Sequence, residues 1–345
     1  MIFLIGILPS CGDENITNPN EDKVTFEKTG LDGKIVNEIK SSGDLLFALT
    51  NSGLYKKSLG NSSEWFSLNL DDKDVIGLQI RSNGDLLVAW NALPGEIPAS
   101  GLLLSTDEGA SWENLENNFG GDESEPFSSF YADSNDESLI YAGGNGVLAK
   151  SVDGGVTWIP VWGEWAMLAN GLDEISINPN NAQELWFGGQ GGIENGYLIK
   201  KSDAEEVTWD NLVPNPTVVK DITFNPANSD SVLVGFEGAL LRTYDSGQNW
   251  ETLIESEDNR FFFGNAFRPD NTQVIYSGGW LKFFDDPQEL VLYISENGGT
   301  DWEEYKYDNE DFGGIVSMKL IEKENKDELY IGLYKGGVYK VTIVH

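Results

Sequence analysis

Tryptophan and carboxylate side chains on long loops are the residues of this chain that could do binding chemistry. Indole faces stack on sugars or peptide side chains, and carboxylates accept hydrogen bonds from hydroxyl groups or pair with ammonium groups. The predicted ligand-binding residues are Trp90, Trp162, Trp165, Trp280, Glu164, Asp285 and Asp286. The alternative is that these aromatic residues cover acidic loops or pack in the interior.

A pair of carboxylates across a cleft would also suffice for glycoside hydrolysis, with one as acid and the other as base or nucleophile. Residues that could supply such a pair are Glu164, Glu174, Asp221 and Asp285. The chain has 57 acidic residues, so candidates of this kind arise by chance, and we assign no catalytic residue.

Composition excludes several classes of function. The formal charge of −35 disfavours nucleic-acid binding, which needs Lys and Arg to neutralise phosphates. Cys11 is the only cysteine and His345 the only histidine, so zinc sites and His-dependent triads are not expected. We predict no cofactor. The acidity indicates a solvated surface, with calcium binding as the second interpretation.

The elements that must position these residues are visible as a repeat. The phrase Ser-x-Asp-x-Gly-x-x-Trp occurs at 105–112 and 151–158, with Asn297 in place of Asp at 295–302, and with an opening Thr at 243–250. A degenerate copy contains Asp203, and a further turn keeps little more than Trp65. The tryptophans follow one another at intervals of 41 to 52 residues, which is typical of one supersecondary unit that stacks on its neighbours.

Seven short apolar segments that close on small residues predict seven second strands in an all-β fold. They are Leu45–Ala48, Leu86–Ala89, Ile140–Gly143, Leu185–Gly188, Val232–Gly235, Ile275–Gly278 and Leu329–Gly332. Each lies between an alternating segment and a Gly-led segment. This pattern favours a single seven-bladed β-propeller of four-stranded antiparallel blades over residues 23–345.

The last unit lacks a fourth strand of its own. The segment at about 24–30, Val-Thr-Phe-Glu-Lys-Thr-Gly, has the character of a strand without a unit. We expect it to pair with the C-terminal blade, which closes the ring and removes an exposed sheet edge.

The repeated phrase resembles the Asp-box, or BNR, repeat of sialidase-like propellers. The resemblance implies that Asp107, Asp153, Asp203, Asp245 and Asn297 lock turns on the face away from the active site. The chain lacks the Arg-Ile-Pro signature of sialidases and has only Arg81, Arg242, Arg260 and Arg268, so classical sialidase activity is not expected. Non-catalytic relatives include the sortilin-like receptors and the photosystem assembly factors, whose rings are docking surfaces.

If the phrase joins third and fourth strands, then the second-to-third loops and the connections between blades share the opposite face. The enlarged segments 90–100, 162–165, 257–263 and 279–289 fall there. Long loops on a rigid scaffold are where binding sites concentrate, so we expect function on this face.

The N-terminus resembles a bacterial lipoprotein signal. Residues 1–10 hold a short apolar run that leads to Cys11, the predicted lipidation site, and 11–22 form the predicted flexible tether. We therefore expect an outer-membrane lipoprotein that contacts the membrane only through its lipid and is monomeric.

The function predicted from these observations is non-enzymatic binding of a protein or glycan. The alternative is a glycoside hydrolase that uses two carboxylates of the same face. Large xyloglucan-cleaving enzymes with related repeats place the cleft between two propellers, whereas this chain has one.

Overall fold

The computed structural model describes residues 23–60, 64–122, 125–133, 135–165, 171–191, 196–202, 205–208, 218–308 and 311–345. The predicted signal peptide 1–10, the tether at 11–22 with Cys11, and Asp203 lie outside the described residues.

Within these described residues, twenty-eight strands form seven antiparallel sheets of four strands each, which confirms the predicted seven-bladed propeller. The first strands of the blades are β2 (Val36–Ser42), β6 (Lys73–Ile80), β10 (Ser129–Ala132), β14 (Gly171–Ile177), β18 (Val219–Phe224), β22 (Phe261–Phe267) and β26 (Ile315–Lys323). The second strands are β3 (Leu45–Thr50), β7 (Leu86–Ala92), β11 (Ile140–Gly143), β15 (Leu185–Gln190), β19 (Val232–Phe236), β23 (Ile275–Trp280) and β27 (Lys326–Leu333).

The two outer strands of each blade complete the sheets. The third strands are β4 (Gly53–Ser58), β8 (Ser100–Ser105), β12 (Val147–Ser151), β16 (Gly196–Ser202), β20 (Ala239–Thr243), β24 (Leu290–Ser295) and β28 (Gly337–Val344). The fourth strands are β5 (Phe66–Ser67), β9 (Glu113–Leu115), β13 (Ile159–Gly163), β17 (Glu205–Thr208), β21 (Trp250–Glu255), β25 (Glu303–Tyr307) and β1 (Val24–Gly30). All seven predicted apolar segments lie in second strands.

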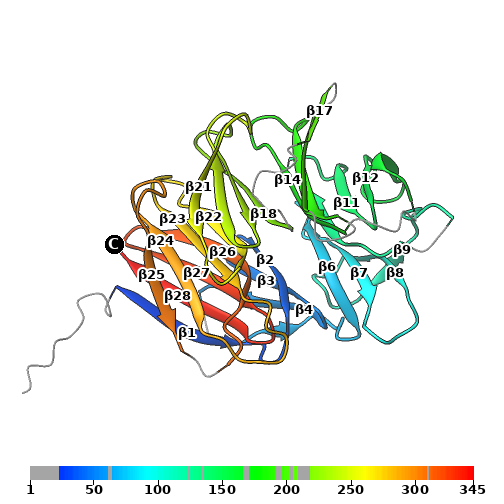
Figure 1. The fold of residues 1–345 in the computed structure, drawn as a ribbon. Coiled ribbons are helices and arrows are strands. Elements are labelled where there is room, and N and C mark those ends of the chain that lie inside the picture. The colour runs from blue at the N-terminus through cyan, green and yellow to red at the C-terminus, as the bar shows by residue number, and fades with distance from the viewer. Residues whose placement is uncertain are drawn as a thin grey trace, which may run out of the picture.

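The ring closes through β1, as the sequence predicts. Val24 pairs with Ile343 and Phe26 with Val341, so the first strand of the chain becomes the fourth strand of the last blade. Figure 1 shows the blue β1 beside the red β28. Each first strand contacts the next around the ring, and β26 contacts β2. The first strands therefore surround the central axis.

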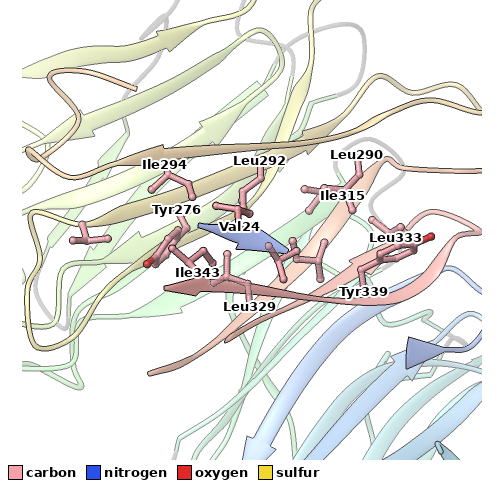
Figure 2. Packing of buried hydrophobic residues seen from close by; sticks show 13 residues of the cluster. Val24, Tyr276, Leu290, Leu292, Ile294, Ile315, Leu329, Leu333, Tyr339 and Ile343 are labelled. Carbon is pink, nitrogen blue, oxygen red and sulfur yellow. The ribbon is translucent and has the colours of Figure 1, made fainter. Parts of the chain in front are cut away.

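The core lies between neighbouring blades rather than in one centre. Figure 2 shows side chains from β23, β24, β26, β27, β28 and β1 packed between the sixth and seventh sheets. Leu290, Leu292 and Leu333 are fully buried there. Each such side chain stabilises the folded state by roughly 1.5–3 kcal/mol through burial. Packing between neighbouring sheets therefore takes the place of a single hydrophobic core.

In the described part of the chain no helix is long and apolar enough to cross a membrane.

Candidate functional site

A pocket of about 660 Å³ lies at the centre of the ring. All seven first strands line it, mostly with residues from their first halves, and Trp280 and Tyr334 add side chains from the second strand of the sixth blade and the second-to-third turn of the seventh. First strands begin where the connections between blades end. The pocket therefore lies toward the face of the enlarged loops.

Six of the seven first strands carry an irregularity near their start, within the described residues. At each one a single residue has no partner on the second strand, and a bulge of this kind re-aims side chains. The residues left without a partner are Asn37, Ile76, Asp173, Lys220, Phe263 and Val316. All six line the pocket, and Ser128, just before β10, lines it from the remaining blade.

Charged side chains of the pocket are partly paired with each other. The ammonium group of Lys220 lies 2.8 Å from Asp173, and that of Lys40 lies 3.3 Å from Glu38 and donates to the carbonyl of Leu78 at 2.9 Å. The first ion pair joins two adjacent blades, and the second lies within one strand. Each pair neutralises one carboxylate and one ammonium group of the pocket.

Asp221 is held by uncharged donors. Its Oδ2 accepts hydrogen bonds from Thr223 Oγ1 at 2.8 Å and from Asn265 Nδ2 at 2.9 Å. Ser277 Oγ donates to Asn265 Oδ1 at 2.6 Å, which fixes the direction of the amide. Burial raises the pKa of Asp221 to about 7, although the two donors act in the opposite direction. Asp221 therefore changes its protonation near neutral pH.

Glu174 lies on the neighbouring strand β14, and its side chain makes no hydrogen bond or ion pair within the described residues. Removal from bulk water raises the pKa of Glu174 well above its usual range, and the charges of Asp221, Glu38 and Asp173 add to this effect. The protonated form of Glu174, which can donate a proton or a hydrogen bond, is therefore favoured more than in an exposed glutamate.

Asp74 and Lys319 complete the charged lining. Asp74 accepts a hydrogen bond from Asn37 Nδ2 at 3.0 Å, and burial raises its pKa. Burial lowers the pKa of Lys319, and the nearby charge of Glu38 only partly compensates. Both shifts have the same cause, which is that burial disfavours the charged form of each side chain.

An aromatic wall borders the pocket on the side of β22 and β26. Trp280 stacks on Tyr334 with ring centroids 4.5 Å apart, and Phe284 meets Trp280 edge-on at 5.3 Å. The ammonium group of Lys220 lies 5.4 Å from the ring centre of Phe263. Trp280 is 7% exposed, and its indole N–H has no hydrogen-bond partner within the described residues.

The other three predicted tryptophans have different surroundings. Trp162 stacks on Tyr197 at 5.4 Å and meets Phe187 at 5.2 Å, which places it between the third and fourth blades. Trp165 packs edge-on against Phe119 at 5.1 Å. These positions agree with the packing alternative, and a ligand-binding role for the two residues stays a prediction.

Trp90 lies at the end of β7 beside the loop 93–99. The ammonium group of Lys73 stands 4.1 Å from its ring centre, and its buried indole N–H has no hydrogen-bond partner in the described part of the chain. The loop itself encloses a small apolar hollow of about 290 Å³. Trp90 does not line the central pocket.

The predicted loop carboxylates remain at the surface. Glu164 and Asp286 are exposed, and Asp285 pairs with Lys335 at 3.0 Å while 91% of its side chain is exposed. The structure thus brings Glu174, Asp221 and Trp280 together in the pocket and leaves Glu164, Asp285 and Asp286 outside it.

The repeated phrase forms the turns between third and fourth strands. Asp107 Oδ1 accepts from the backbone N–H of Ser111 at 2.8 Å, and Ser105 Oγ accepts from the N–H of Gly109 at 2.8 Å. Asp153 repeats this pattern with Thr157, and Asn297 repeats it with Asp301. The Ser111 hydroxyl also donates to Asp107, at 2.6 Å. This bond, together with those from the Ser111 N–H and the Ser105 hydroxyl, lowers the pKa of Asp107 to about 2.

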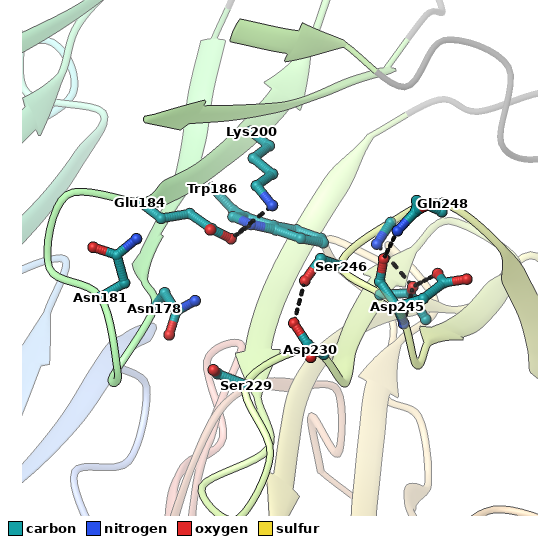
Figure 3. Close-up of polar contacts among 12 residues, drawn as sticks. Asn178, Asn181, Glu184, Trp186, Lys200, Ser229, Asp230, Asp245, Ser246 and Gln248 are labelled. Atoms are coloured by element: carbon teal, nitrogen blue, oxygen red, sulfur yellow. Dashed lines mark hydrogen bonds and ion pairs between the residues drawn. The ribbon is translucent and has the colours of Figure 1, made fainter. Parts of the chain in front are cut away.

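Asp245 makes the same turn in the fifth blade, where it accepts from the N–H of Asn249 at 2.7 Å. Figure 3 shows the turn beside Ser246, which donates to Asp230 at 2.7 Å. The same view shows Lys200 and Glu184, 3.1 Å apart, next to the buried Trp186. Side chains on this face bond to one another, unlike Glu174 in the pocket.

Most of the charged pocket residues lie inside strands, so the lengths of the loops do not point to them. Aligned first strands nevertheless share a pattern in which an apolar residue precedes two variable positions and a further apolar residue. It is seen in Val36–Ile39, Leu172–Ile175 and Val219–Ile222. The two variable positions of these three strands hold the pocket residues Asn37, Glu38, Asp173, Glu174, Lys220 and Asp221.

Among the described residues, no group of three or more His, Cys, Asp or Glu side chains is arranged to hold a metal ion.

No family model matches the chain, and no curated protein matches its sequence. Solved structures match its fold. A GH74 xyloglucanase from Xanthomonas campestris has a TM-score of 0.65 and 14% identity over 90% of this chain, which spans 52% of the enzyme. Virginiamycin B lyase from Staphylococcus aureus has a TM-score of 0.65 and 15% identity, covering 93% of this chain and 99% of the lyase.

YCF48 from Cyanidioschyzon merolae has a TM-score of 0.60 and 11% identity, covering 92% of this chain and 98% of its own. The three neighbours are seven-bladed propellers, and they include both enzymes and a non-catalytic protein. At identities this low, the structural similarity establishes the propeller fold alone, and the function has to be inferred from the site.

Proposed function

We propose that this protein is a non-enzymatic binding protein whose ligand, a glycan or a segment of a protein, enters the central pocket. The observation that carries the proposal is the set of bulges that turns one side chain of almost every first strand into the same 660 Å³ space. A concave site of this size suits a short ligand segment better than the flat face of a folded protein, which needs about 800 Å² on each partner.

A polar lining with an aromatic wall supports this proposal. Glu174 has unused hydrogen-bonding capacity, and Trp280 with Tyr334 supplies an apolar surface against which a ring or side chain can pack. Desolvated polar groups without partners cost free energy in the empty protein, and a ligand that pairs with them recovers it.

Binding of the full-length chain to glycan and peptide panels tests the proposal. Asp221→Asn and Trp280→Ala are expected to weaken binding of any ligand found, whereas Asp285→Asn, on the same face but outside the pocket, is the matched control. Binding that survives both pocket substitutions would contradict the proposed site.

A glycoside hydrolase is the second candidate, because Glu174 and Asp221 line one pocket and the charge of Asp221 raises the pKa of Glu174. Glu174, whose pKa is raised well above its usual range, would be the proton donor, and ionised Asp221 the base or nucleophile. Release of reducing ends from a polysaccharide panel, abolished by Glu174→Gln and by Asp221→Asn separately, would favour this candidate over simple binding.

We further propose that the chain is held at the bacterial outer membrane by a lipid on Cys11. The basis is the sequence of residues 1–11 alone. Metabolic labelling with a clickable fatty acid should mark the wild-type protein and leave Cys11→Ser unmarked. Equal labelling of both would contradict lipidation at this position.

A further inference from the structure

Three carboxyl groups of the central pocket lack a cationic partner. Asp173 has Lys220 and Glu38 has Lys40, whereas Asp74, Glu174 and Asp221 form no ion pair within the described residues. Only Lys319 is left on the positive side, and it too has no carboxylate within ion-pair distance among those residues. The pocket therefore has three unpaired acids against one unpaired base.

The unpaired acids are not spread evenly around the ring. Glu174 and Asp221 lie on β14 and β18, which are adjacent, and the charge of Asp221 acts on Glu174. The next strand, β22, contacts β18 and carries Phe263, which lies 6.1 Å from Trp280 between ring centres. Lys319 lies on β26, one blade further along. A positive group beside Asp221 would thus stand near aromatic faces, which attract cations.

We propose that the central pocket binds its ligand through a primary ammonium group that sits between the carboxyl groups of Glu174 and Asp221. This inference rests on the proposed binding function and names the chemistry of the ligand. Amino sugars and the lysine side chain or amino terminus of a peptide share this group. The formal charge of −35 over the whole chain also draws cations toward the protein.

Binding of an ammonium group must be linked to release of protons. The groups that face the site are Glu38 and Lys40 on β2, Asp74 on β6, Tyr131 on β10, Asp173 on β14, Lys220 on β18, and Lys319 on β26. Tyr131 stays neutral because burial raises its pKa to about 12. Asp221 ionises near pH 7 in the empty pocket, so an ammonium ligand should bind more tightly as the pH rises through that value.

The first experiment compares charged and neutral probes on the full-length protein by calorimetry. Nα-acetyl-lysine amide carries one ammonium group, and its Nε-acetylated form carries none. Glucosamine and N-acetylglucosamine form a second matched pair, and the pair that binds identifies the source of the amine. We expect the ammonium form of at least one pair to bind about tenfold more tightly than its neutral form at pH 7.5. This factor corresponds to a difference of about 1.4 kcal/mol in binding free energy.

The second experiment uses variants and pH. Asp221→Asn and Glu174→Gln should each weaken binding of the ammonium probe about tenfold, and Lys319→Gln should strengthen it because a repelling charge is removed. Asp285→Asn should leave the affinity unchanged. For the wild type, affinity for the lysine probe should rise at least about tenfold from pH 5.5 to 8, because the probe stays protonated while Asp221 ionises.

Equal affinity for the charged and neutral probes would overturn the inference, and so would failure of all four probes to bind. The proposed binding function is judged separately. A neutral glycan or peptide from the panels that loses affinity in Asp221→Asn would uphold the pocket while refuting the ammonium group. Circular dichroism spectra of the variants that match the wild type show that lost binding is not lost folding.

Discussion

Aspartate has opposite acidities in two parts of this protein, and the contrast shows what each part can do. In the turn, Asp107 accepts bonds from a hydroxyl and from backbone N–H groups, and these hold its pKa at about 2. In the pocket, loss of water around Asp221 raises its pKa to about 7. Donors that favour the anion make the turn aspartates permanent acceptors, whereas Asp221 is able to exchange a proton.

The pocket aspartate should weaken the fold as the pH rises. The folded-state pKa of Asp221 lies above the unfolded value of 3.8, so the folded protein binds more protons between the two values. The contribution of Asp221 to stability is therefore greatest below pH 4 and is lost as the pH rises to about 7, by up to about 4 kcal/mol. Asp221→Asn should remove this loss, which urea unfolding of both proteins from pH 4 to pH 8 measures.

The difference between the two unfolding free energies isolates Asp221 from the other acids. It should grow in favour of Asp221→Asn up to about pH 7 and stay constant above it. Parallel curves for wild type and variant would show that Asp221 titrates normally.

The turn pairs offer a charge exchange. Asp245 Oδ2 accepts from Asn249 Nδ2 at 2.7 Å, whereas Asn297 Nδ2 donates to Asp301 Oδ2 at 2.8 Å, so the same turn is built with acid and amide interchanged. Asn249→Asp should place two carboxylates face to face and lower the melting temperature by about 2–4 °C at pH 7. Adding Asp245→Asn reproduces the arrangement of the sixth blade and should restore the melting temperature in differential scanning fluorimetry.

Two results would refute this account of the turn. One is a double variant that melts no higher than Asn249→Asp alone. The other is a single variant whose deficit persists at a pH low enough to protonate both carboxylates.

At the scale of strands, the regular features could be predicted from sequence and the irregular ones could not. Leu185–Gly188 and its counterparts are apolar runs closed by small residues, and they mark second strands because both faces of these strands are buried. The bulge at Lys220 has no such signal, because a bulge is a difference in register between two strands and depends on both. Sequence alone could propose that Glu174 and Asp221 reach the face of the enlarged loops. It could not identify Asp173 and Lys220, because these are the bulged residues.

Loop tryptophans show a second limit of sequence reasoning. Trp162 lies near the end of β13, and nothing in its neighbours along the chain shows that Tyr197 and Phe187 of the next blade contact it. Spacing places such a residue on a face of the ring, but the packing between blades decides whether it is available to a ligand. Trp280 also contacts the next blade, where it stacks on Tyr334, but it lines the pocket.

The position of Trp162 predicts a loss of stability without a loss of binding. Trp162→Ala removes contacts with two aromatic rings at the interface of the third and fourth blades and should lower the unfolding free energy by about 2–3 kcal/mol. Affinity of the folded protein for a pocket ligand should not change. Urea unfolding measures the first quantity and calorimetry the second.

Ile159→Ala is the matched control, because Ile159 lies on the same strand with 65% of its surface exposed and should change stability by less than about 0.5 kcal/mol. Weaker ligand binding by folded Trp162→Ala would instead restore the ligand-binding role expected from the sequence.

At the scale of the whole molecule, the ring depends on two segments that are far apart in the chain. β1 supplies the outer strand of a blade whose other three strands are the last of the chain, and Phe26 stacks on Tyr307 of the preceding blade at 4.9 Å. Without β1 the edge of β28 would be open to pairing with other chains. Closure also keeps the first strands in one ring, on which the shape of the central pocket depends.

A disulfide across this closure tests how far it governs stability. Thr25 and Thr342 are register partners on β1 and β28, at a Cα separation that antiparallel pairing keeps within the range of disulfides. In a Cys11→Ser background, Thr25→Cys with Thr342→Cys should raise the unfolding free energy by about 2–4 kcal/mol when oxidised, because the bond closes a loop of most of the chain in the unfolded state. Reduction should return the protein to the stability of the Cys11→Ser parent, and Thr25→Cys alone should show no redox response.

If opening of β1 precedes unfolding of the ring, the oxidised protein should also resist proteolysis at 37 °C for longer than the reduced one. Equal proteolysis rates would mean that the ring opens between two other blades first, and the closure strand would then not be its weakest joint.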